Sequence, residues 1–198
     1  MARPTTSALR RAALAATATT MVLTLSACSG DAEGGGPDGA GGPSDGTQAG
    51  PPPLSTHTTM GVISGKLPGD SRERLKKKIA EVVDDWLDAA YVGDWPRSGN
   101  AYPHFTARAA ADAKRDAGLM SNARLGKELE SVEATKRRLR IDVLAVKHRA
   151  VGVTARFVLG MELAGEVNRA ERVAGSLFLT WQDGDWQVFG YDVQRGKA

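Results

Sequence analysis

The clearest pattern in this 198-residue chain is an apolar stripe of helical period between residues 70 and 92. Polar and charged residues mostly fall on the other side of this period, as in a helix that buries one face. Asp70 and Glu73 have the spacing of a capping box at its start, and Gly93 followed by Pro96 marks its end. The stripe consists of Leu75, Ile79, Val82, Val83, Trp86, Leu87 and Ala90.

A loop over residues 94–104 separates this helix from a second, alanine-rich one. Thr106 is a suitable N-cap for a helix at 107–117, and Gly118 is a suitable stop. The segment 119–131 fits either one or two further helical turns or an irregular connection.

From about Val132 the apolar period changes from 3.6 to 2, which indicates strands. Short connections at 147–149, 164–169 and 183–185 join four such runs, so neighbouring strands must be antiparallel. Strands of this length can twist and curl around the amphipathic helix. The fold class that we expect is α+β, with N-terminal helices packed in a curved antiparallel sheet.

The first 28 residues have the order of an export signal. Arg3, Arg10 and Arg11 give a basic start, and the apolar run at 12–25 is too short and too weakly apolar to span a membrane. The run ends in Leu-Ser-Ala-Cys, and Cys28 is the only cysteine of the chain.

This ending resembles a bacterial lipoprotein signal. The resemblance implies that diacylglycerol is attached to the Cys28 thiol and that residues 1–27 are removed as a signal peptide. It places the protein at the outer face of the cytoplasmic membrane, with the lipid bilayer as its first partner. The alternative is an ordinary secretory signal followed by a free cysteine. Either general secretion or twin-arginine export could deliver the chain.

The segment after Cys28 has the composition of a tether. Residues 29–53 hold nine Gly and five Pro among 25 positions, with almost no large apolar side chain, so they cannot offset the entropy of ordering. Residues 54–65 are transitional, and Met60 and Ile63 could dock as a short strand. The expected organisation is a signal at 1–27, a lipidated and Gly/Pro-rich tether at 28–65, and a folded domain at 66–198.

The formal charge of +3 comes from the signal segment. Without its three arginines, 23 of the 26 basic residues remain against 23 acidic ones. A balanced charge with no large basic cluster does not favour nucleic-acid binding. With one cysteine there is no disulfide within the chain. The domain of about 130 residues must therefore be held together by its hydrophobic core alone.

Helices followed by a long meander that closes with Gly-Asp-Trp-Gln-Val-Phe-Gly-Tyr-Asp-Val (184–193) resemble the nuclear transport factor 2-like superfamily. The resemblance covers roughly 66–194 and implies a cone in which a bent sheet wraps a long helix. More narrowly, the chain is similar to secreted or anchored proteins of high-GC Gram-positive bacteria. Such cones serve enzymes and binding proteins alike, and they often pair through the outer face of the sheet, so both monomer and homodimer remain open.

Few side chains suit acid–base chemistry in an apolar pocket. The weak catalytic candidates are His104 and Asp192. His104 lies in the loop before the second helix, and Asp192 lies on the same face of the last strand as Trp186 and Val188, which is expected to point inward. Trp95 and Tyr102, in a Gly/Pro-containing loop, are candidates for the rim of a ligand or partner site. No motif for a metal or a cofactor is present in the sequence.

These observations favour a non-catalytic, membrane-anchored binding module for an envelope protein or an apolar ligand. Two alternatives stay open. The domain could be an isomerase, dehydratase or cyclase acting on a small hydrophobic substrate, or an accessory subunit of an envelope transport complex.

Overall fold

The computed structural model describes residues 54–198. Helix α1, Gly69–Ala90, is the amphipathic helix that the sequence predicts. Its buried residues are the seven members of the predicted stripe, so that prediction is confirmed. The predicted capping box is wrong. The helix starts earlier, with Pro68 as its N-cap and no side-chain cap, and Asp70 lies inside the first turn.

Helix α2, Ala107–Arg115, begins where the sequence predicts. The Thr106 side chain accepts a hydrogen bond from the Ala109 N–H at 3.3 Å, which confirms the cap. The helix ends before Gly118, which instead lies in a separate short turn, α3, Ala117–Met120.

Four long strands follow as the predicted antiparallel meander: β3, Leu129–Val146, β4, Arg149–Gly165, β5, Arg169–Gln182, and β6, Asp185–Lys197. Lys147 and His148 form the turn between β3 and β4, and Asp183 and Gly184 form the turn between β5 and β6. All four have positive φ, as in the two-residue turns whose twist matches a hairpin.

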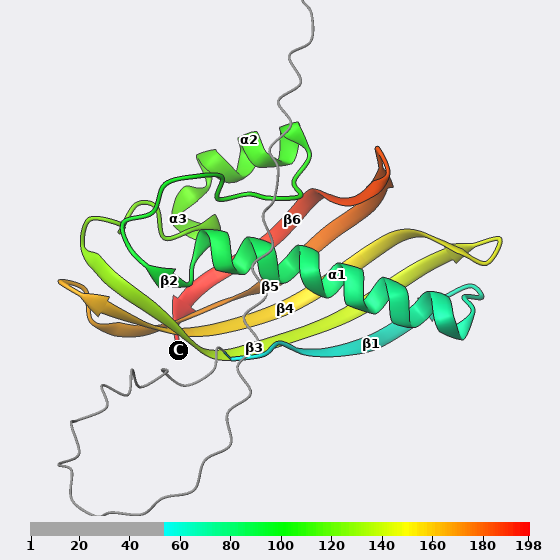
Figure 1. Ribbon diagram of the computed structural model, residues 1–198, viewed down its shortest axis with the longest axis horizontal. Coiled ribbons are helices and arrows are strands. Elements are labelled where there is room, and N and C mark those ends of the chain that lie inside the picture. Colours follow the sequence, from blue (N-terminus) through cyan, green and yellow to red (C-terminus); the bar gives the residue numbers. More distant parts are fainter. Residues whose placement is uncertain (1–53) are drawn as a thin grey trace, which may run out of the picture. The chain divides into compact units, whose positions relative to one another are not determined.

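The sheet is mixed, so the expectation of a purely antiparallel sheet is wrong. Strand β1, His57–Ser64, is an edge strand of the sheet that pairs with β3 and runs parallel to it (Figure 1). The long helix α1 separates β1 from β3 in the chain, and a crossover of this kind lets two neighbouring strands run in the same direction. A two-residue strand, β2, Gly93–Asp94, pairs antiparallel with β3 near Val132.

Strand β1 also sets where the described domain begins. The sequence predicts that residues 57–64 belong to the tether and allows a short strand near Met60 and Ile63. The structure places these residues in the sheet. The sheet therefore starts before Lys66. Residues 1–53 lie outside the described residues. They include most of the expected tether and the Leu-Ser-Ala-Cys segment at 25–28 that resembles a lipoprotein signal, which we call the lipobox.

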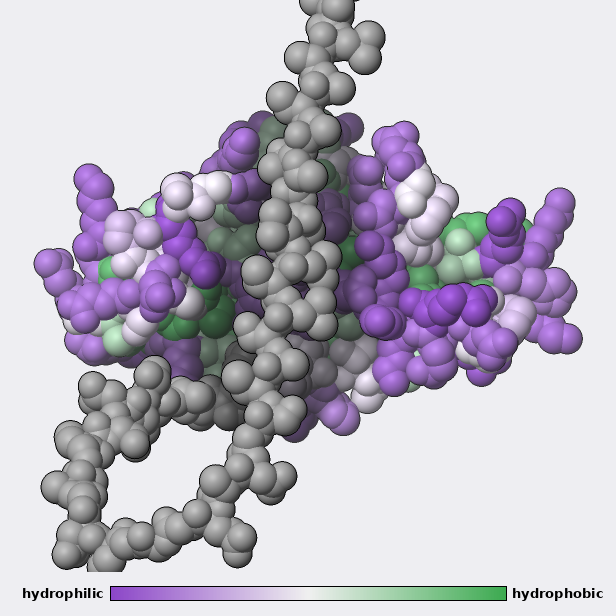
Figure 2. Space-filling model, in the orientation of Figure 1, coloured by the Kyte–Doolittle hydropathy of each residue, from purple (hydrophilic) through white to green (hydrophobic). Residues whose placement is uncertain are grey.

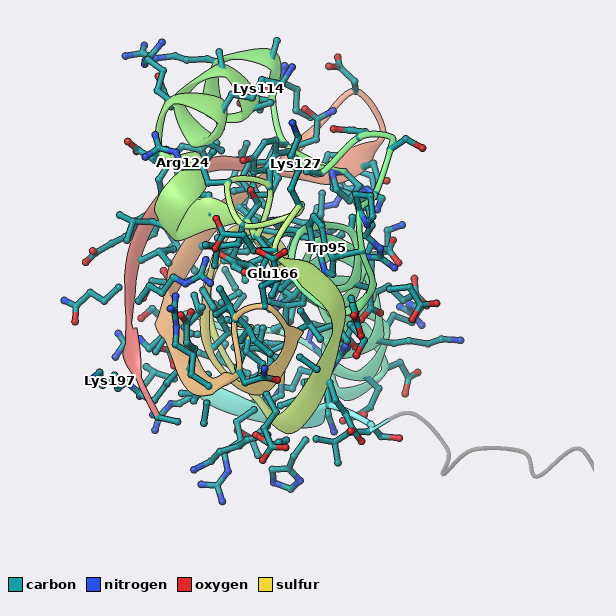
Figure 3. All side chains as sticks on the ribbon, turned by 90° about the vertical axis from the view of Figure 1, so that its left-hand side faces the viewer. Trp95, Lys114, Arg124, Lys127, Glu166 and Lys197 are labelled. Carbon is teal, nitrogen blue, oxygen red and sulfur yellow. The ribbon has the colours of Figure 1, made fainter. Side chains whose placement is uncertain are left out.

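The core lies between α1 and the sheet. Trp86 is fully buried at its centre, and its ring makes edge-on contacts with Tyr91 and Phe157 at centroid distances of 5.5 and 5.1 Å. Figure 3 shows the sheet curving around an interior occupied by side chains. Within residues 54–198, the buried apolar residues of this core run from Leu67 to Val193.

We expect deletion of residues 29–53 to leave the stability of the domain unchanged, because their Gly/Pro-rich composition offers almost no large apolar side chain to pack against the core. Thermal unfolding of residues 29–198 and 54–198, followed by circular dichroism, tests this. We expect the two melting temperatures to agree. A lower value for the shorter chain would show that part of the tether packs on the domain.

Candidate functional site

His104 lies at the surface, between α1 and the hairpin of β5 and β6. Its Nε2 is 2.8 Å from an Asp85 carboxylate oxygen and its Nδ1 is 3.8 Å from Asp185. Its backbone is left-handed, with φ of 60°, and its carbonyl accepts a hydrogen bond from the Val188 N–H. The imidazole therefore joins α1 to the hairpin, and it does not face an apolar pocket.

Asp192 is exposed on the face of the sheet opposite α1, where an inward position was expected. The cause is a β-bulge. Leu179 pairs with Val188 and Phe178 pairs with Gly190, so Phe189 is an extra residue in β6. One extra residue exchanges the two faces of all later positions, which turns Val193 inward and Asp192 outward. His104 and Asp192 are therefore not brought together.

The two predicted rim residues differ in their surroundings. Tyr102 is buried in the core, where its hydroxyl donates to the Ala113 carbonyl at 3.0 Å, so the structure places it away from any rim. Trp95 is partly exposed and lines a shallow hollow with Asp88 and Arg97, and its indole N–H donates to the Tyr91 carbonyl. Cys28 lies outside the described residues.

A groove of about 690 Å³ lies at the start of α1. Its walls are the first turns of α1, the turn between β3 and β4, and the ends of β5 and β6. In Figure 2, hydrophobic surface is exposed among hydrophilic side chains at the end of the domain where the turn between β3 and β4 lies. We call this groove the hairpin groove, and its volume is in the range of small-molecule binding sites.

The floor of the hairpin groove is aromatic and aliphatic. Trp181 and Trp186 face each other across β5 and β6 in an edge-on pair with centroids 5.8 Å apart. Trp186 is buried, whereas 56% of Trp181 is exposed. Leu75 is buried beneath the groove and Val151 is exposed along its side. An exposed tryptophan above a buried apolar floor leaves area that a ligand could cover.

The charged lining of the groove is basic. Arg74, Lys78 and Arg149 line it, and none of the lining residues carries a carboxylate. Lys78 forms an ion pair with Asp185 at 3.2 Å, whereas Arg74 and Arg149 form none within residues 54–198.

Asp185 stands just outside the groove and stays ionised there. Partial burial alone would raise the pKa of Asp185, but the Trp186 N–H, Lys78 and His104 outweigh it and hold the pKa below its ordinary value. Asp185 therefore neutralises Lys78 and leaves the two arginines as the available positive charges.

The opposite end of the domain is closed by a buried ion pair. Glu171 Oε2 accepts from Arg195 Nε at 2.5 Å, and both side chains are nearly inaccessible. Arg195 also donates to the carbonyls of Gly118 and Ser121 and to Asn122 Oδ1, at 3.2, 3.0 and 2.7 Å. The Arg195 guanidinium thus satisfies its donors and fixes α3 to β6, so this cluster is part of the structure and offers no binding site.

Two other perturbed groups also belong to contacts between elements. Burial raises the pKa of Asp84, against the opposing effects of its Thr56 hydrogen bond and of Arg137. Burial and the neighbouring Asp116 raise the pKa of the Tyr191 hydroxyl, which donates to that carboxylate at 2.8 Å.

The outer face of the sheet also exposes apolar side chains, Val62, Leu144, Val146 and Phe189 among them. Val62, Leu144 and Phe189 line a second hollow of about 420 Å³ with the carboxylate of Asp142. That carboxylate accepts from the Val62 N–H and pairs with Arg140 and Arg156.

Neither a metal site nor a membrane-spanning helix appears within residues 54–198. No group of three His, Cys, Asp or Glu side chains there is arranged to hold a metal ion. No helix among them is both long and apolar enough to cross a bilayer.

The sequence missed the hairpin groove because its walls come from three separate segments. The available signal was the position of Trp181 and Trp186 on either side of a predicted hairpin, with basic residues at the neighbouring turn. Comparisons with family models, with curated proteins and with solved structures give no match to this chain.

Proposed function

We propose that this protein is a lipid-anchored, extracytoplasmic binding module without chemistry of its own. The observation that carries the proposal is the hairpin groove, an open site with an apolar floor and available arginines. The groove holds no pair of groups suited to acid–base catalysis, because its titratable lining consists of basic residues with His148 at the turn. Its chemistry suits the retention of a ligand.

The interior of the domain supports a binding role over an enzymatic one. The space between α1 and the sheet, where enzymes of the cone type place their substrates, is occupied here by Trp86, Phe157 and Met161. The two candidate acid–base residues lie apart, with His104 beside α1 and Asp192 on the outer face. The element order supports the further proposal that the fold is a nuclear transport factor 2-like cone.

The anchor is the second half of the proposal and rests on the sequence. The signal-like start, the lipobox and the Gly/Pro-rich segment would hold the domain outside the cytoplasmic membrane at the end of a tether. A flexible coil of about 30 residues spans roughly 30 Å, enough to let the domain reach ligands in the surrounding envelope.

Cys28→Ser should release the protein from membranes or block its processing, because the thiol that would carry diacylglycerol is lost. Fractionation of producing cells, with the domain detected by antibody in membrane and soluble fractions, measures this. Ser26→Ala leaves the thiol in place and serves as the matched control. Unchanged membrane retention and processing of the Cys28→Ser protein would contradict the lipid anchor.

A further inference from the structure

We propose that the hairpin groove binds a single amphipathic anion, a molecule with one alkyl chain and an acidic head such as a carboxylate or a phosphate. The chain would lie on the apolar floor, and the head would meet the two arginines at the rim. The inference deepens the binding role proposed above and rests on it. It names the class of ligand and the residues that select it.

The floor of the groove favours a slender apolar chain. Leu75 and Trp186 are buried at its base, while Trp181 and Val151 remain exposed at its sides. A chain lying between them would cover the exposed ring and bury its own methylene groups. Burial of apolar surface is the main driving force for such binding.

The charge at the rim favours an acidic head. Arg74 and Arg149 are exposed beside the groove and have no ion-pair partner within the described part of the chain, whereas Lys78 is already neutralised by Asp185. Guanidinium groups bind carboxylates and phosphates through charge-assisted hydrogen bonds of matching geometry. A cationic head would find no carboxylate among the lining residues.

The same edge is less suited to an anionic membrane surface. A surface-binding edge would present basic or apolar tips to the lipid head groups, but the turn between β5 and β6 carries Asp183 and Asp185. The two arginines without ion-pair partners among residues 54–198 line the rim of a concave groove. A single dissolved molecule therefore fits the distribution of charge better than a flat bilayer does.

Isothermal titration of residues 29–198, which contain the described domain and lack Cys28, tests the proposal with soluble probes. We expect octanoate to bind about tenfold or more tightly than octylammonium or 1-octanol, because only octanoate forms the charge-assisted contacts with the arginines. Decanoate should bind about fifteenfold more tightly than octanoate, since each of its two further methylenes strengthens binding by about fourfold when buried. Decyl phosphate separates a preference for phosphate from one for carboxylate.

Two groove variants should weaken decanoate binding by about tenfold each: Arg149→Glu through lost charge and Trp181→Ala through lost contact area. Their matched controls are Arg172→Glu and Phe189→Ala, which change exposed residues on the outer face and should bind as the parent does. Circular dichroism melts of all four variants establish that each is folded.

Three results would overturn the proposal: equal affinity for the anionic, cationic and uncharged probes, equal loss in the outer-face controls, or binding to anionic phospholipid vesicles without binding to monomeric decanoate. None of these would touch the anchor, because release of the Cys28→Ser protein is measured in cells without any added ligand. Failure of the proposed ligand class and failure of the lipid anchor are thus separate outcomes.

Discussion

Trp86→Ala should lower the free energy of unfolding by about 3–5 kcal/mol, the usual cost of truncating a large buried aromatic side chain. Trp86 is fully buried, and its ring contacts Tyr91, Phe105 and Phe157. It lies in the last two turns of α1 and fills the space inside the sheet. Its removal leaves a cavity that surrounding elements could fill only by moving inward. Long strands that are fixed by their neighbours allow little movement of this kind.

Urea unfolding of residues 29–198, followed by circular dichroism, measures this loss. Natural domains are stable by about 5–15 kcal/mol, so the variant should keep a small part of its stability or unfold outright. Trp181→Ala is the matched control, because Trp181 is more than half exposed and its loss leaves no enclosed cavity. A loss at Trp86 no larger than at Trp181 would mean that the interior rearranges freely.

Trp86→Phe separates the two properties of this side chain. The indole N–H of Trp86 is buried without a hydrogen-bond partner among residues 54–198. Phenylalanine keeps most of the ring area and removes that unpaired donor, whose burial is itself unfavourable. We therefore expect the phenylalanine variant to be clearly more stable than the alanine variant.

Arg195→Ala should be the second most destabilising change, with a loss of about 3–5 kcal/mol, as found when one partner of a buried ion pair is removed. Glu171 is buried, and its second carboxylate oxygen pairs with the more exposed Arg169. The change would also free the carbonyls of Gly118 and Ser121, which Arg195 now caps. The end of the domain around α3 should loosen first.

The double variant Glu171→Leu, Arg195→Met should recover much of this loss. Apolar residues of similar volume remove the charge that would otherwise remain buried and unpaired, and such replacements are often neutral or stabilising. Urea unfolding of the parent, the two single variants and the double variant gives the coupling between the partners. Arg172→Ala, beside Glu171 on the exposed face of β5, is the control, with an expected change within about 0.5 kcal/mol. Additive effects in the cycle would contradict a coupled pair.

The sequence alone determined the elements whose signals are local. The seven apolar positions of α1, the Thr106 cap of α2 and the two-residue turns of the meander are each encoded by the spacing of a few nearby residues. Hydrophobic period and turn chemistry act over one to three turns of helix or a single hairpin, so they can be recognised without knowledge of the rest of the chain.

Tertiary structure decided where those elements meet and which faces they present. The bulge at Phe189 moved Asp192 from the expected inner face to the outer one, and packing against α2 buried Tyr102. The parallel pairing of β1 with β3 joins segments about 80 residues apart, as between Thr58 and Leu139.

The hairpin groove has the same origin. It combines the start of α1 with the turn between β3 and β4 and the tryptophan pair of β5 and β6. These features depend on register and on contacts between distant segments, and a one-residue shift in register reverses every side chain that follows. Local sequence patterns do not indicate such register shifts, so the candidate site can be recognised only in the assembled sheet.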